Sequence, residues 1–200
     1  YGFNAGSALA ANGSAGMALF VTHIAASAGA LTWMTCEWVK FGKPSGLGIV
    51  TGMVAGLGTI TGAAGVVGPA GALVIGVLAG VICFFMTQLI KKTLKIDDSL
   101  DVFPVHGVGG VLGTLLAGIF CSPDLGVFSG FGYAAGHDSM ASQLGIQILG
   151  IVVIASYTAM LTWLLLKLTS LLTKGLRVSD DEEREGLDLV SHDERGYDLN

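Results

Sequence analysis

Long apolar stretches separated by short polar segments dominate the chain. Residues 44–90 and 102–123 contain no Asp, Glu, Lys or Arg. Runs of this length predict helices that cross a membrane, each of which needs about 20 residues. Residues 1–11 are typical of the end of an apolar helix that begins outside this sequence. The crossings that follow are expected at residues 16–38, 47–60, 70–90, 102–120 and 141–166.

The uncharged stretch of residues 44–90 is too long for one helix, and glycine and proline divide it near its middle. The first of the two resulting spans is rather short. Each span contains a GxxxG pair, Gly52 with Gly56 and Gly76 with Gly80. Because this spacing lets helix backbones approach closely, we expect an all-α polytopic membrane protein with a tightly packed helical bundle.

The fourth predicted crossing carries one ionisable side chain, His106. Gly109, Gly113 and Ala117 recur at four-residue spacing, and Gly110 lies one turn beyond His106. The side of the helix that carries these small residues favours close contact with neighbouring helices. We therefore expect His106, on the same side, to point into protein or a cavity. An ionisable group at this depth predicts a functional site, and the alternative is a hydrogen bond that helps the helices pack.

Three other polar residues leave alternatives open. His23 lies mid-span among alanines, as either a buried hydrogen-bonded histidine or a functional one. Asp98 could cap the fourth span, with Asp101 as its third residue facing unpaired backbone amides. Asp101 could instead belong to a polar network beneath a conduction path.

The composition agrees with a membrane protein. The 200 residues have a mean hydropathy of +0.71 and only 12% charged residues. Residues 177–200 hold nine acidic and three basic side chains, so the net charge of -5 is a property of the tail and no nucleic-acid partner is expected. The cysteines are expected to be small core or lipid-facing residues, without metal-ligand spacing: Cys36, Cys83 and Cys121.

The positive charges predict the orientation. All ten Lys and Arg residues lie in residues 40–43, in residues 91–95 or after residue 166. Because cytoplasmic loops are enriched in these residues, the start of the chain is expected outside a plasma or bacterial inner membrane and its C-terminus in the cytoplasm. We expect a transmembrane domain over residues 1–174 and a cytoplasmic regulatory tail over residues 175–200.

The tail has the pattern of a short capped helix. Ser179 and Glu182 fit a capping box, the helix should cover residues 180–185, and Gly186 should stop it. The tail is either a solvated acidic segment or a regulatory element whose apolar residues dock on the membrane domain.

Several motifs occur together in one order. They are Phe-Asn-Ala-Gly-Ser at 3–7, Gly-Lys-Pro-Ser at 42–45, Asp-Asp-Ser-Leu-Asp-Val-Phe-Pro-Val-His-Gly-Val-Gly-Gly at 97–110, Gly-Leu-Arg-Val at 175–178 and Glu-Arg-Glu-Gly-Leu-Asp at 183–188. From residue 1 to about residue 197, the chain resembles the Amt/Mep/Rh family of ammonium transporters.

The resemblance implies an eleven-helix protomer with inverted repeats, assembled as a homotrimer with one pore per protomer. This chain would be its C-terminal half. By position, His106 matches one histidine of the pore pair, Phe3 one of two stacked phenylalanines, and Ser7 the hydroxyl of the outer recruitment site. Their counterparts belong to the other half.

The resemblance also implies supporting roles for Asp101 and Thr61. The family usually has Thr-Pro where this chain has Thr61-Gly62, so the backbone geometry there is open. In the family the tail takes part in communication between protomers and in contact with PII-type signalling proteins. The tail residues assigned to partner binding are Arg177, Glu185, Gly186 and Asp188.

The expected function is ammonium transport without a cofactor or metal. An aromatic face and a hydroxyl offset part of the dehydration cost of the cation, and an apolar lumen favours loss of its proton. Ammonia then passes the histidine pair. The rival classes are an ammonium sensor that signals through its tail and a membrane enzyme or haem protein, which a visible absorption spectrum would expose.

Overall fold

The computed structural model describes residues 1–173 and 175–196, and within them every regular element is a helix. It forms two compact units, Tyr1–Ile151 and Val152–Asn200. The helices are α1 (Gly2–Gly6), α2 (Gly13–Phe41), α3 (Gly46–Ile60), α4 (Pro69–Gln88), η1 (Leu89–Thr93), η2 (Phe103–Val108), α5 (Gly109–Phe120), η3 (Gly126–Phe128), α6 (Met140–Thr173), α7 (Asp180–Glu185) and α8 (Leu187–His192).

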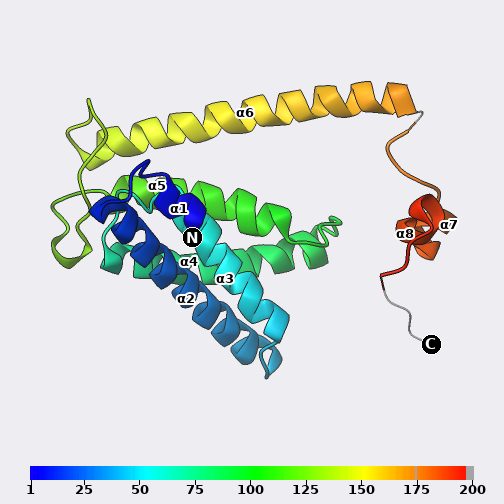
Figure 1. Ribbon diagram of the computed structural model, residues 1–200, viewed down its shortest axis with the longest axis horizontal. Helices are drawn as coiled ribbons and strands as arrows, with labels where there is room; N and C mark the ends of the chain where they lie inside the picture. The colour runs from blue at the N-terminus through cyan, green and yellow to red at the C-terminus, as the bar shows by residue number, and fades with distance from the viewer. Residues whose placement is uncertain (174, 197–200) are drawn as a thin grey trace. The chain divides into compact units, whose positions relative to one another are not determined.

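In the first unit, α2, α3 and α4 pack on one another, while α5 lies against α3 and α4 (Figure 1). Both predicted GxxxG pairs lie at close contacts between helices. A Cβ atom added to Gly56 or Gly76 would collide with the backbone oxygen of Ala25, and one added to Gly52 or Gly80 would collide with that of Gly29. The glycines of α3 and α4 therefore hold both helices tightly against the same part of α2, as the sequence predicts.

In the part of the chain that the structure describes, four helical segments are long and apolar enough to cross a membrane: Gly13–Phe41, Pro69–Thr93, Phe103–Phe120 and Met140–Thr173. The fifth, Gly46–Ile60, is shorter, as expected. The predicted end of the last helix at residue 166 is wrong, because α6 continues to Thr173. The first crossing also runs beyond its predicted end, to Phe41, where Gly42 stops it with a φ of +82°.

The second unit holds the C-terminal part of α6 and the tail helices. The predicted capping box is confirmed, since the Ser179 hydroxyl accepts from the Glu182 amide while the Glu182 carboxylate accepts from the Ser179 amide. Gly186 ends α7 at the predicted place, with a φ of +101°. A further helix, α8, was not predicted. The expected domain limits at Lys174 and Asn200 lie outside the described residues.

Candidate functional site

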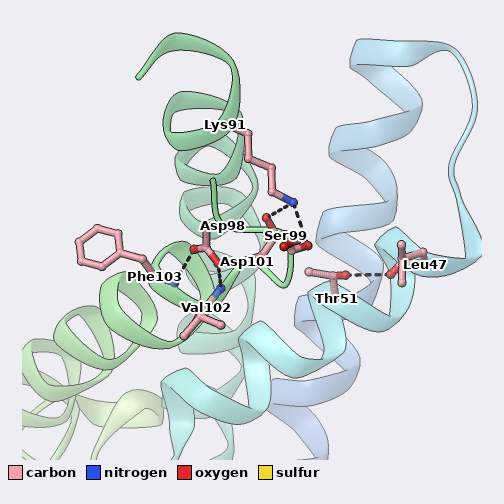
Figure 2. A network of polar contacts seen from close by, with 8 residues as sticks. All are labelled: Leu47, Thr51, Lys91, Asp98, Ser99, Asp101, Val102 and Phe103. Carbon is pink, nitrogen blue, oxygen red and sulfur yellow. Dashed lines mark hydrogen bonds and ion pairs between the residues drawn. The ribbon is translucent and has the colours of Figure 1, made fainter. Parts of the chain in front are cut away.

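His106 lies in η2, a π-helical turn that leads into α5. The first backbone amides of this turn have a side-chain partner. The two carboxylate oxygens of Asp98 accept hydrogen bonds from the backbone amides of Val102 and Phe103, both at 2.8 Å (Figure 2). The predicted capping role of Asp98 is confirmed, and it fixes the helix start that carries His106.

Asp101 does not act as a capping residue. It precedes the helix in the left-handed conformation, with a φ of +55°, which Asp tolerates better than most residues. Its carboxylate forms an ion pair with Lys91, Nζ to Oδ1 at 2.7 Å, and the lysine also donates to the backbone oxygen of Ser99 (Figure 2). The expected third position in the helix is wrong because the helix begins at Val102.

His106 lies beside the buried glycine stripe of its helix rather than within it. Val105, Gly109 and Gly113 are buried, whereas His106 is exposed in this chain. A Cβ on Gly113 would collide with the backbone oxygen of Thr59 in α3, so the glycine stripe packs against protein. His106 lies one position away from this stripe, on the open side. The sequence pattern assumed an unbroken α-helix, and a π-helical turn rotates the residues that follow it.

Small residues surround the open side next to the imidazole. A Cβ on Gly58 of α3 would lie 3.7 Å from His106 Nδ1, and one on Gly62 would lie 3.9 Å from Thr114 Oγ1. A Cβ on Gly110 would meet no atom within 4 Å. We call these five residues the His106 face. Its glycines leave space beside a side chain that can donate or accept a hydrogen bond.

A second group of predicted site residues lies on α1. Phe3 is 78% exposed, and the Ser7 hydroxyl donates to the Phe3 backbone oxygen at 2.9 Å. That donation leaves the lone pairs of the Ser7 oxygen free to accept. Asn4 anchors the helix, since its buried side chain donates to Thr22 Oγ1 of α2 at 3.0 Å. Phe3 and Ser7 thus lie together on one helical turn.

The remaining polar positions have local partners. The Tyr1 hydroxyl lies 2.9 Å from His23 Nδ1, so the expected hydrogen bond of His23 is confirmed, but its expected burial is wrong. Thr61 is exposed and donates to the backbone oxygen of Leu57 at 2.7 Å. Within the described residues no group of three His, Cys, Asp or Glu side chains is placed to hold a metal ion.

The structure brings together Phe3 with Ser7, but it records no hydrogen bond from either to His106 within the described residues. Two contacts that hold the candidate site residues in place were not predicted from the sequence. They are Asn4 with Thr22 and Lys91 with Asp101. The amide side chain of Asn4, between Phe3 and Ser7 in an apolar helix, is a sequence signal for the contact with Thr22. For the second, opposite charges ten residues apart on either side of a turn are a weaker signal.

In the tail, the two carboxylate oxygens of Glu183 accept from Arg177 Nη2 at 3.0 and 2.9 Å. Gly186 is placed close to Asp188, whose Oδ1 lies 2.7 Å from where a Cβ of Gly186 would be. The Ser179 hydroxyl and amide both bond the Glu182 carboxylate, and they lower its pKa from the ordinary 4.5.

This shift predicts a pH dependence of α7. Because the pKa of Glu182 is lower in the folded helix, its contribution is present above the unfolded pKa and is lost as the pH falls through the folded value. Amide exchange of residues 180–185 in the purified protein, corrected for intrinsic rates, should show decreasing protection below about pH 4.5. Glu182→Gln keeps a capping-box side chain without its titration, so its protection should change less with pH. Equal pH profiles for the two proteins would contradict the assignment.

The sequence of the chain is similar to those of known proteins over nearly its whole length. The sequence model described as Ammonium Transporter Family matches residues 1–197. An ammonium transporter of Aquifex aeolicus is 45% identical over 199 residues, covering 100% of this chain and 45% of that protein. One of Bacillus subtilis is 38% identical over 201 residues, covering 98% of this chain and 48% of that protein. The chain thus spans about half the length of these relatives.

The chain also resembles solved structures of Amt and Mep2 proteins. The structure titled Sensor Amt Protein superposes with a TM-score of 0.84 at 33% identity, covering 96% of this chain and 45% of that one. Mep2 of Candida albicans superposes with a TM-score of 0.78 at 33% identity, covering 91% of this chain and 40% of that one.

Proposed function

Because this chain belongs to the ammonium transporter family, we propose that the complete protein moves ammonium or ammonia across a membrane and that these residues supply one side of its path. Family membership supports a transporter rather than an enzyme. The observation that carries the proposal is the exposed imidazole of His106 within a membrane-length helix, next to space left by glycines. An ionisable group at this depth is costly to place, so its presence points to a functional role.

The proposed first step is recruitment of the cation at α1. The exposed ring of Phe3 offers a face for a cation–π contact, and the Ser7 oxygen can accept an N–H bond. Both interactions replace part of the water that ammonium loses on entry. Asn4 and Thr22 hold this turn against α2.

The proposed second step is transfer of a proton from ammonium to water at the outer entrance, before the resulting ammonia passes along the His106 face. An apolar lumen disfavours the charged form, so the substrate proceeds as neutral ammonia. His106 can donate to ammonia or accept from it, which offsets the loss of water in the lumen. Potassium has no proton to lose, so this route selects against it. The capped helix start at Asp98 and the Lys91–Asp101 pair hold the position of His106.

The same proposal includes the assembly and its orientation. The complementary half would cover the open His106 face, and three copies would form a trimer with one pore each. The basic loops favour an orientation with the C-terminus on the cytoplasmic side of a plasma or bacterial inner membrane. There α7, with Arg177, Glu185, Gly186 and Asp188, would meet a PII-type signalling protein.

Recruitment at α1 can be tested in the complete protein. Phe3→Ala and Ser7→Ala should each raise the ammonium concentration for half-maximal uptake, by about threefold to tenfold for the phenylalanine, because a cation–π contact is lost. The maximal rate should change little. Leu9→Ala is the control, since Leu9 is 93% exposed in the same segment and has no assigned contact with substrate. An unchanged half-saturation value in both variants would remove α1 from the proposal.

A second candidate function is ammonium sensing. It is favoured by the superposition on the structure titled Sensor Amt Protein and by the ordered tail helix α7. A sensor would bind ammonium at the same groups without sustained flux. Ammonium binding by folded protein that conducts neither ammonium nor ammonia would favour this candidate over transport.

A further inference from the structure

A cluster of positive charge and aromatic rings lies where α2 and α4 end. Lys40 Nζ lies 5.8, 5.5 and 5.2 Å from the ring centroids of Phe41, Phe84 and Phe85. Lys92 Nζ lies 5.0 Å from the centroid of Phe41. Two ammonium groups therefore approach one aromatic ring from different helices.

Within the first unit the charges of this cluster have no acidic partner. Among the described residues neither Lys40 nor Lys92 takes part in an ion pair. Glu37, one turn before Lys40, accepts from Ser45, and Asp101 pairs with Lys91, the residue before Lys92. A lysine near a helix C-terminus complements the helix dipole, but this effect does not require two ammonium groups at one ring. An anion between them would relieve their repulsion.

We propose that Lys40 and Lys92, placed around the Phe41 ring, bind the phosphate of an anionic phospholipid in the adjacent leaflet. The position suits a headgroup, because the site lies at the ends of two helices long enough to cross the membrane. Exposed apolar side chains, Trp38 and Leu89, lie within one turn of Phe41 and Lys92 and can contact acyl chains. A soluble phosphate would make no use of that surface. Basic pockets between membrane helices recognise lipid headgroups in this way.

The test is native mass spectrometry of the complete, detergent-purified protein titrated with phosphatidylglycerol. Phosphatidylcholine with the same acyl chains is the comparison. The double variant Lys40→Gln/Lys92→Gln should weaken phosphatidylglycerol binding roughly 10- to 30-fold, because two headgroup contacts are lost. Lys43→Gln/Lys95→Gln removes the same charge three residues further along each segment, from lysines that have no contact with the ring, and it should bind like wild type. Lys40→Arg/Lys92→Arg keeps both cations and should also retain binding.

Three results would overturn the proposal. Equal losses in the two glutamine variants would mean that only the overall charge of the loops matters. Equal binding of phosphatidylcholine by wild type would mean that the site does not recognise an anionic headgroup. Displacement of the lipid by millimolar inorganic phosphate, with binding of phosphate alone lost in Lys40→Gln/Lys92→Gln, would assign the cluster to a soluble anion.

Discussion

Ammonium uptake by the complete protein is expected to fall about tenfold or more when His106 is replaced by alanine. The imidazole is the hydrogen-bonding group that η2 exposes beside Gly58 and Gly110. Its removal leaves ammonia without a partner at that point of the path. Loss of one hydrogen bond worth about 1.4 kcal/mol in the rate-limiting step corresponds to a tenfold lower rate.

The initial rate of internal pH change in proteoliposomes after ammonium addition measures this effect. His23→Ala is the matched control, because His23 is also an exposed histidine in a membrane-length helix but bonds to the Tyr1 hydroxyl. The control should keep most of the rate. Equal rates for wild type and His106→Ala, at equal amounts of folded protein, would remove His106 from the path.

The second large effect is expected for stability. In Gly113→Ala, the new methyl group would collide with the backbone oxygen of Thr59, which cannot rotate away as a side chain could. Either α3 or α5 must shift, and overpacking of this kind costs about 1–3 kcal/mol. The midpoint of thermal unfolding of the purified protein should therefore fall.

Gly110→Ala is the control for this change because it lies on the same helix, three residues earlier, with no atom near its missing Cβ. Alanine is the better helix former by up to about 1 kcal/mol, so this variant should be as stable as wild type or more so. If Gly113→Ala unfolded at the same temperature as Gly110→Ala, the close contact of α5 with α3 would be wrong.

The positions of the helices and some of their ends could be predicted because they depend on local chemistry. Uncharged runs such as residues 70–90 must satisfy their backbone polar groups internally at membrane depth, which selects helices. The capping of α7 by Ser179 and Glu182 is likewise local, and so is its end at Gly186. Each of these features depends on residues within a few positions of one another.

The arrangement around His106 could not be predicted because it depends on tertiary contacts. Hydropathy does not record a π-helical turn, so the sequence pattern does not show that His106 lies one position away from the buried glycine stripe. The Lys91–Asp101 pair requires the turn between η1 and η2 to fold back, and the burial of Asn4 requires α2 to supply Thr22. Which side chains are exposed in this half depends on how its own helices pack.

The central claim is that the complete protein moves ammonium or ammonia selectively. The most direct measurement records the current and the internal pH of proteoliposomes after an ammonium pulse, with an equal potassium pulse as the comparison. The account predicts a response to ammonium in at least one of the two signals and none to potassium. Folded protein that gives neither a current nor an ammonia flux, or that conducts potassium equally well, would contradict it.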